Sequence, residues 1–394
     1  LDFEKGTAKG SARSIEGFHL YDELAKKRDI LPHFGGHPMA AGMTLPLEQV
    51  DELRKRLHNQ AQAVLTDEQL VQKLYIDVPI DLSEVTVEAI EEIRKLGPFG
   101  TEFAKPVFAL EKVNVASMRR IGTQENHLKL ELEDAYGKID AIGFSKGYLY
   151  NEISYDVQVS FVGDLQINEW QGRKKPQFMI EDVQTEEWQL YDYRGKSQAA
   201  NWLSKLVIDQ TDFVAFQQQT VNHYEQIIQR PIHLIDREEC YKALRPYVVI
   251  LDLPTNVQLL ENMLREKQFK RIYAHFYTSN SQYFNGMPTR QHFSWYYSFL
   301  KKRPKFNLKM HIEPLSQHIG LNIDVIKFMT KVFFELGFVT IENGLTTVVE
   351  NAPKRALEEA PSYKLRSQQI ELEQKLLYAT YTELKQWFNE RMKG

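Results

Sequence analysis

Two adjacent glycines followed by a histidine, Gly35-Gly36-His37, form the most chemically suggestive stretch of the sequence. Glycine lets the backbone approach a ligand closely, and successive N–H groups in a glycine turn can form a concave anion site. The imidazole of His37 could stabilise charge on a phosphate oxygen or give it a proton. We predict that Gly35 and Gly36 bind a phosphate and that His37 is the catalytic residue, as proton donor to the scissile phosphate.

A second cluster, upstream of the first, carries side chains suited to the same ligand. Arg13 has planar, forked donors that match phosphate oxygens, and Ser11 and Ser14 add rotatable hydroxyl donors. Contacts of this kind hold the sugar-phosphate chain without reading its bases. We therefore predict that Ser11, Arg13 and Ser14 form a second wall of a phosphate-binding site. We interpret His19 and His33 as structural residues.

The order of these motifs resembles that of a known domain. Gly10-Ser11-Ala12-Arg13-Ser14, then Gly17-Phe18-His19-Leu20, then the stretch from Phe34 to Gly42 resemble the GGH-bearing domain of DHH-superfamily phosphoesterases. Within that superfamily the match is to the RecJ family of bacterial exonucleases, which degrade single-stranded DNA from the 5′ end. The resemblance is specific over residues 1 to about 185. It implies the C-terminal portion of a 5′→3′ exonuclease acting in DNA recombination and repair.

The resemblance also implies a division of labour. In the family, a metal-activated water is the nucleophile, and two divalent metals, Mn²⁺ or Mg²⁺, lie in an N-terminal DHH catalytic domain. No Asp-His-His occurs in this sequence, which begins at Leu1 without a methionine. The carboxylate pairs Glu91-Glu92 and Glu186-Glu187 lack metal-ligand spacing. We expect a fragment that binds no metal, acts with that DHH domain on single-stranded DNA, and is inactive alone.

Bulk properties are those of an ordinary globular chain. The 394 residues carry a net charge of −4, with 43% hydrophobic and 26% charged residues, so nucleic-acid binding must rest on local charge. The single cysteine, Cys240, excludes an internal disulfide framework and a thiolate zinc site. With no apolar run of membrane-spanning length and no signal peptide, we expect a cytoplasmic protein without membrane contact.

Alternating segments after residue 106 predict an OB-type β-barrel, a common platform for single strands. The expected strands are Val107–Ala116, His127–Glu133, Lys138–Phe144, Tyr155–Ile167 and Gln177–Val183. A further strand is expected at 74–80, and helices at 46–64 and 87–96. We expect Arg119 and Arg120 at a turn, Lys129 on a strand, and residues 173–175 in a loop beside Trp170. Together these residues predict a DNA-binding surface made of Arg119, Arg120, Lys129, Trp170, Arg173, Lys174 and Lys175. Taken singly, each charge could instead be a solvated turn residue.

The C-terminal half changes period. Short apolar runs at 231–235, 247–251 and 271–276 alternate with helical patterns, which favours a parallel sheet with crossover helices. No glycine-rich phosphate loop follows these runs, which argues against nucleotide binding by this module. A helix, a glycine turn, a helix and two strands between 315 and 349 describe a winged helix, and 371–388 predicts a final amphipathic helix.

Residues 265–311 combine ten Lys and Arg with one acid, Glu266, and many aromatic side chains. They could bind nucleic acid by charge and stacking, or form the core between two modules. The second helix of the winged helix has few basic residues, so we expect it to dock to protein, for example single-strand-binding protein or a helicase.

These patterns together predict four domains and a multidomain α/β and β fold. They are an α+β GGH domain at 1–75, an OB-type domain at 76–187, an α/β parallel-sheet module at 188–300, and a winged helix with a C-terminal helix at 301–394. Two alternatives to the exonuclease remain open. One is a DHH-superfamily phosphodiesterase that acts on short oligonucleotides or cyclic dinucleotides, and the other is a module that recruits partners. Strand polarity, metal preference and oligomeric state do not follow from the residues.

Overall fold

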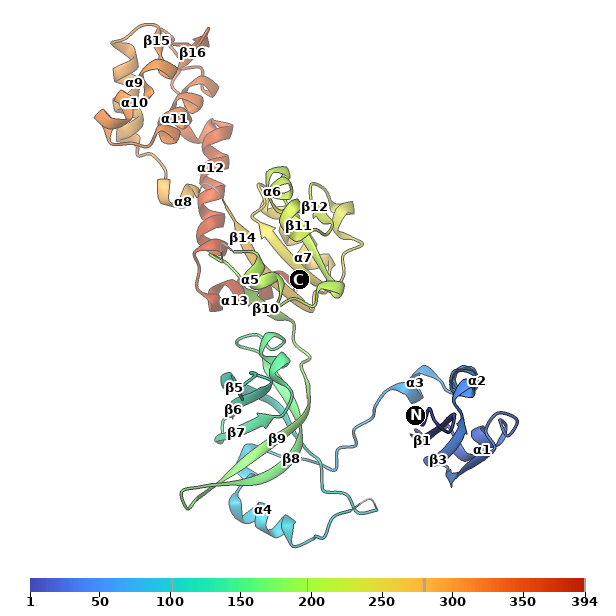
Figure 1. Cartoon of the computed structure of the whole chain (residues 1–394). Coiled ribbons are helices and arrows are strands. Elements are labelled where there is room, and N and C mark those ends of the chain that lie inside the picture. The colour runs from blue at the N-terminus through green and yellow to red at the C-terminus, as the bar shows by residue number, and fades with distance from the viewer. Residues whose placement is uncertain (101, 197, 279–280, 393–394) are drawn as a thin grey trace. The chain divides into compact units, whose positions relative to one another are not determined.

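The computed structural model describes residues 1–100, 102–196, 198–278 and 281–392. Contacts within the chain divide it into two compact units (Figure 1). The first ends at Asp77 and the second begins at Val78, and each has its own hydrophobic core. No helix in the described parts is long and apolar enough to cross a membrane.

The first unit is a small three-stranded antiparallel sheet covered on one face by helices. Its strands pair in the order β1-β3-β2, and apolar side chains of one sheet face pack against Leu24 and Leu53 of the helices. The helix predicted at 46–64 is present, with a 3₁₀ turn first. The elements are β1 (Thr7–Arg13), α1 (Leu20–Ala25), β2 (His33–His37), β3 (Ala40–Pro46), η1 (Leu47–Gln49), α2 (Val50–Val64) and α3 (Asp67–Leu70).

The strand predicted at 74–80 is largely wrong. Only β4 (Val78–Pro79) forms, because it alone pairs with another strand, at Phe108 and Ala109. Tyr75 before it is 74% exposed, so the alternating pattern there covers no core.

A closed five-stranded barrel opens the second unit. Its strands pair in the cyclic order β5-β6-β7-β9-β8-β5, which is the OB connectivity, as predicted. Inward-facing apolar residues such as Leu130 and Phe161 fill it, and α4 packs on β8 and β9. The elements are η2 (Leu82–Glu84), α4 (Val87–Arg94), β5 (Phe108–Ile121), β6 (His127–Glu133), β7 (Lys138–Gly143), η3 (Gly147–Asn151), β8 (Gln158–Trp170) and β9 (Arg173–Gln184).

The next module confirms the predicted parallel sheet. Its order is β10-β14-β13-β11-β12, all parallel, with a separate apolar core on each face. The elements are β10 (Gln189–Asp192), α5 (Ala200–Leu203), η4 (Ile208–Gln210), β11 (Thr211–Ala215), α6 (Gln218–Ile228), β12 (Ile232–Leu234), η5 (Glu238–Tyr241), β13 (Tyr247–Asp252), α7 (Val257–Glu266), β14 (Arg271–Tyr277) and α8 (Gln282–Asn285).

The winged helix is also present. Helices α10 and α11 precede a hairpin that pairs with a short strand in the order β15-β17-β16. Six of the 13 residues of α11 are buried, so one face of this helix builds core. The elements are α9 (Arg290–Lys301), β15 (Phe306–Asn307), α10 (Leu308–Ile319), α11 (Ile323–Glu335), β16 (Val339–Glu342), β17 (Leu345–Val348) and η6 (Leu357–Glu359).

The single helix predicted at 371–388 is wrong. Instead α12 (Pro361–Leu372) runs into a π-helical turn, η7 (Glu373–Leu377), and a new helix, α13 (Tyr381–Met392), follows. Thr380 caps the new helix, since its hydroxyl and N–H both bond with the Glu383 side chain or backbone. This local hydrogen bonding competes with continued helix, and α13 returns to pack on α7.

Candidate nucleic-acid interface

The exposed face of the first sheet brings the two predicted phosphate clusters together. Ser11 and Gly35 both pair with Gly42 of the central strand, and Arg13 and His37 both pair with Ala40. Directly paired residues of a sheet project to the same face. We call this surface the GGH face, and it comprises Lys9, Ser11, Arg13, His33, Gly35, His37, Ala40, Gly42 and Thr44.

The predicted glycine turn is wrong. Gly35 and Gly36 lie within the edge strand β2, and neither has a positive φ, so no concave nest of amides forms there. The ladder to β3 explains this, because it requires extended backbone from His33 to His37. The glycines leave a flat surface along the middle of this edge strand.

Each glycine has a different steric role. A Cβ at Gly35 or Gly42 would meet open space on the GGH face. A Cβ at Gly36 would collide with the Ala40 carbonyl oxygen and with Ala41, on the opposite side of the sheet. Gly36 therefore permits strand packing, whereas Gly35 and Gly42 keep the exposed backbone uncovered.

Positive charge on the GGH face has no carboxylate partner. The Arg13 guanidinium donates to the Ser11 hydroxyl at 2.9 Å, and within the described residues neither Arg13 nor Lys9 forms an ion pair. Arg13 and His37 stand two strands apart, about 10 Å between backbones. The two exposed side chains thus flank the half-buried Ala40.

Of three nearby side chains, Ser14 and His33 differ from the sequence prediction and His19 agrees with it. Ser14 donates its only hydroxyl hydrogen to the Phe18 carbonyl at 2.5 Å, so it supports the loop rather than the face. His19, interpreted as structural, caps α1 by accepting from the Asp22 N–H. His33, also interpreted as structural, instead lies exposed on the GGH face. It pairs with Thr44, and Lys9 pairs with the same Thr44 from the opposite strand. Only the period-two spacing to His37 could have signalled this position.

On the barrel, Arg119 and Lys129 are direct cross-strand neighbours on the outer surface. Both arginines were predicted at a turn, but β5 extends to Ile121 and includes them. Arg120 faces the other way, donates to the Gly147 carbonyl at 3.0 Å and stacks over Tyr150. Lys129 pairs with Asp140 at 2.8 Å. Of this group only Arg119 is an exposed cation with no ion pair in the described chain.

The long hairpin β8–β9 projects the other predicted residues. The loop predicted at 173–175 is wrong, because β9 begins at Arg173 and only Gln171 and Gly172 form the turn. Both turn residues have positive φ, 50° and 74°, the geometry of a two-residue hairpin turn. Register places one set of side chains on a common face, which we call the hairpin face: Asn168, Trp170, Arg173 and Lys175.

The hairpin face combines an aromatic ring with cations. Trp170, directly opposite Arg173, is 73% exposed. Neither Arg173 nor Lys175 forms an ion pair within the described residues. Lys174 projects to the opposite side and pairs with Glu91 of α4 at 2.8 Å; that hydrogen bond raises the pKa of Lys174 and lowers that of Glu91. The three basic residues therefore do not act as one cluster.

Most aromatic side chains of the basic stretch at 265–311 lie in hydrophobic cores. Its aromatic side chains are largely buried in the parallel-sheet module and the winged helix, among them Tyr273, Phe276, Phe293 and Tyr296. Three rings of this stretch are exposed instead: Phe284 at 77%, Trp295 at 40% and Tyr283 at 37%.

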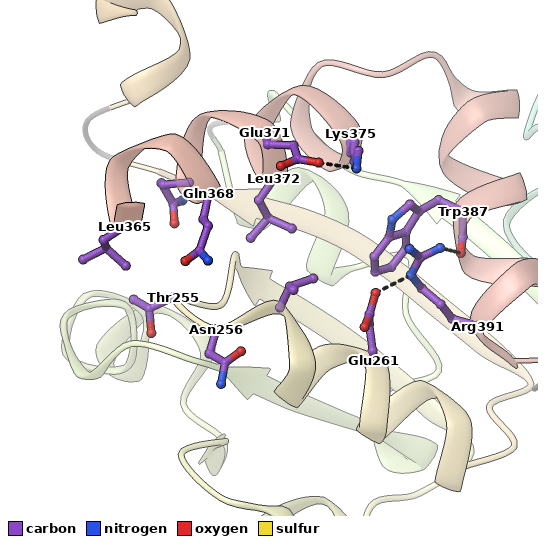
Figure 2. A pocket seen from close by; sticks show the side chains of 12 residues that line it. Thr255, Asn256, Glu261, Leu365, Gln368, Glu371, Leu372, Lys375, Trp387 and Arg391 are labelled. Atoms are coloured by element: carbon purple, nitrogen blue, oxygen red, sulfur yellow. Dashed lines mark hydrogen bonds and ion pairs between the residues drawn. The ribbon is translucent and has the colours of Figure 1, made fainter. Parts of the chain in front are cut away.

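A cleft of about 780 Å³ lies between α7, α12 and α13. Figure 2 shows that its charged side chains face one another as pairs, Glu261 with Arg391 at 2.8 Å and Glu371 with Lys375 at 2.5 Å. Because these pairs use every charged group that lines the cleft, none is left to bind a ligand. We therefore interpret the cleft as a packing gap between helices.

Metal ligands do not gather in the described parts of the chain. No group of three or more His, Cys, Asp or Glu side chains there could hold a metal ion. A divalent cation therefore does not fit the residues that the structure describes.

Comparison with known proteins agrees with this architecture. Family models match in chain order: the DHHA1 domain at residues 1–63, the RecJ OB domain at 76–182, and the C-terminal domain of single-strand DNA-specific exonuclease at 189–388. Single-stranded-DNA-specific exonuclease RecJ of Bacillus subtilis is 42% identical over 397 residues, which is all of this chain and 50% of that protein. RecJ of Haemophilus influenzae is 34% identical over 188 residues, covering 46% of this chain and 32% of that protein.

Solved RecJ structures from Thermus thermophilus are also similar. The complex with Mg²⁺ has a TM-score of 0.38 and 18% identity, and covers 72% of this chain and 41% of that one. The complex with Mn²⁺ has a TM-score of 0.39 and 17% identity, and covers 72% and 39%. The chain therefore spans half or less of the length of these two curated relatives.

The GGH sheet, the closed OB barrel and the parallel-sheet extension with its winged helix define the class, a multidomain chain of the DHH phosphoesterase superfamily. Its C-terminal half narrows the assignment, since the family model there covers half of the chain. The chain belongs to the RecJ family of single-stranded-DNA-specific exonucleases, as the sequence motifs predicted.

Proposed function

We propose that this chain grips single-stranded DNA for a RecJ-type 5′→3′ exonuclease of recombination and repair. The observation that carries the proposal is the GGH face, which aligns Arg13, Ser11 and His37 on one exposed, glycine-centred surface. Unpaired cations beside uncovered backbone suit a sugar-phosphate chain and do not discriminate between bases.

Within this function the residues take separate roles. Arg13, held by Ser11, binds a phosphate through its fork, and His37 donates to a phosphate oxygen across Ala40. Gly35 lets the strand lie close to the sheet. Metal-assisted hydrolysis, with Mg²⁺ or Mn²⁺, belongs to a DHH domain, which the family resemblance implies and the described residues do not provide.

The barrel supplies the second contact. Trp170 stacks on a base while Arg173 and Lys175 lie along phosphates, and Arg119 adds a further cation on the outer surface. An OB barrel with stacking and charge on one surface favours a flexible single strand, whose bases are free to splay, over a duplex.

Equilibrium binding by fluorescence anisotropy tests the proposal. The purified chain should bind a labelled single-stranded oligonucleotide at least tenfold more tightly than the matching duplex. Trp170→Leu should weaken binding about tenfold, because base stacking contributes about 1–3 kcal/mol. Tyr136→Leu is the matched control, since that ring is equally exposed, at 72%, but lies at another turn. Equal affinity for both DNA forms, or equal loss in both variants, contradicts the proposal.

A further inference from the structure

A cleft of about 610 Å³ opens at the carboxyl end of the parallel sheet. It lies beside the ends of β10 and β14, which pair in parallel at Asp192 and Ala274. The first turns of α6 and the end of η7 complete its walls. Ligands of open parallel sheets bind outside the carboxyl ends of strands, and small-molecule sites have volumes of this order.

A column of rings lines this cleft. The His223 and Tyr277 rings stack in parallel, 4.9 Å apart with 5° between planes, and the His275 ring lies 6.5 Å from that of Tyr277 with 14° between planes. His275 is buried and fixed by Tyr224, 2.7 Å away, whereas His223 is exposed. The column therefore ends in an open aromatic surface suited to another planar ring.

Backbone strain helps to build the column. Phe276, just before Tyr277, has a φ of 49° and is buried. A bulky residue rarely adopts this left-handed conformation, and here it coincides with a register shift opposite Ile250 and Asp252. Such bulges re-aim side chains and gather beside functional sites. The bulge ends the strand with Tyr277 beside His223.

One of the two cations that line the cleft forms no ion pair within the described residues. Arg194 is fully used: it binds Asp192 with two hydrogen bonds, at 2.8 and 2.6 Å, and donates to the Leu376 and Ala379 carbonyls. Lys196 follows the turn at Gly195, which has a φ of 71°. Its ammonium lies 4.3 Å from the centre of the Tyr193 ring and forms no ion pair within the described residues. It can therefore bind an anion.

We propose that this cleft binds one nucleotide unit, with the base against His223 and the phosphate at Lys196. The missing glycine-rich loop argued against nucleotide binding, but ring stacking and a lysine replace it here. The unit is either a free mononucleotide or one nucleotide of a DNA strand, since both present the same base and phosphate. This site goes beyond the strand-gripping function and does not rest on it.

Isothermal titration calorimetry of the whole chain tests the site with dAMP, deoxyadenosine and inorganic phosphate. We expect dAMP to bind more tightly than either component, and His223→Leu and Lys196→Gln each to weaken dAMP about tenfold. Lys242→Gln, another exposed lysine of the same module, is the control and should leave affinity unchanged. Thermal unfolding checks that each variant folds.

A second arm identifies the source of the nucleotide. In a chain that also carries Trp170→Leu, Arg173→Gln and Lys175→Gln, His223→Leu weakens oligonucleotide binding if the cleft takes a DNA strand. If it weakens only dAMP, the cleft takes the free nucleotide. The proposal is overturned if dAMP does not bind, if phosphate binds as tightly as dAMP, or if His223→Leu leaves dAMP affinity unchanged. The dAMP result is independent of the barrel, so it separates this site from the proposed function.

Discussion

Lys174 and its neighbours Arg173 and Lys175 are adjacent in sequence but differ in what they can bind. Lys174 forms an ion pair with Glu91, whereas Arg173 and Lys175 extend from the hairpin face without carboxylate partners in the described chain. Sequence reasoning treated them as one basic loop. The difference follows from strand alternation, which sends every second side chain to the opposite surface.

This alternation predicts distinct salt dependences. For single strands, log affinity falls with log salt by about 0.7 per phosphate contact. Arg173→Gln with Lys175→Gln should therefore reduce the slope by about 1.4, measured by anisotropy across a salt series. Lys174→Gln removes an equal type of charge from the same hairpin and should change the slope little. A larger change for Lys174→Gln would contradict this assignment of faces.

At the scale of elements, two substitutions in β2 separate effects on folding from effects on binding. Gly36→Ala should destabilise the first unit by about 1–3 kcal/mol, because its methyl group collides with β3. Gly35→Ala should leave stability unchanged or slightly higher, since its methyl group meets open space. Thermal unfolding measures both effects.

DNA affinity should be sensitive to Gly35→Ala, even though stability is not. Gly35→Ala places a methyl group where we propose the DNA backbone lies, so it should weaken oligonucleotide binding although the unit remains folded. Unchanged affinity in folded Gly35→Ala would remove the GGH face from the DNA path.

Asp252, at the end of β13, predicts a pH dependence of the parallel-sheet module. It is fully buried, and this burial raises its pKa from 3.8 to about 6, although the Phe216 and Gln217 N–H groups donate to it. The folded state therefore holds the proton more tightly than the unfolded state. Stability from this group is present below about pH 4 and falls by about 3 kcal/mol as pH rises through 6.

Hydrogen exchange of β13 amides, followed by mass spectrometry from pH 4.5 to 7.5, measures this effect. The protection of the native chain relative to Asp252→Asn should fall as pH rises. Asn cannot ionise, so this comparison cancels the contributions of other carboxylates. A difference that stays constant or grows with pH would show that the carboxyl is not held protonated by burial.

Much of this architecture could be predicted from local patterns. Alternation at 127–133 and at 138–144 identified barrel strands because one face of each is buried. The short apolar runs at 247–251 and 271–276 identified the parallel sheet because both of its faces are covered.

Other features depended on distant partners. The strand around Gly35 and Gly36 exists because β3 pairs with it, and the break after Leu377 exists because α13 packs on α7. The bond between Ser14 and Phe18 and the ring column at His223 likewise required the folded chain. The motifs identified the family, but they could not show which side chains share a surface.

At the scale of the whole molecule, we propose that the chain provides gripping surfaces, while the described residues provide no cluster of metal ligands. Two surfaces carry exposed, unpaired cations, the GGH face and the hairpin face, and they lie in different units. We therefore propose that this chain holds the strand and that the DHH domain implied by the family resemblance cleaves the bond.

The most direct test incubates the purified chain with a 5′-labelled single-stranded oligonucleotide and Mg²⁺ or Mn²⁺, then measures binding and oligonucleotide length in the same sample. The account predicts a bound oligonucleotide of unchanged length, and release of nucleotides only when the chain is joined to a DHH catalytic domain. Shortening of the oligonucleotide by the chain alone, or failure to bind it, would contradict the account.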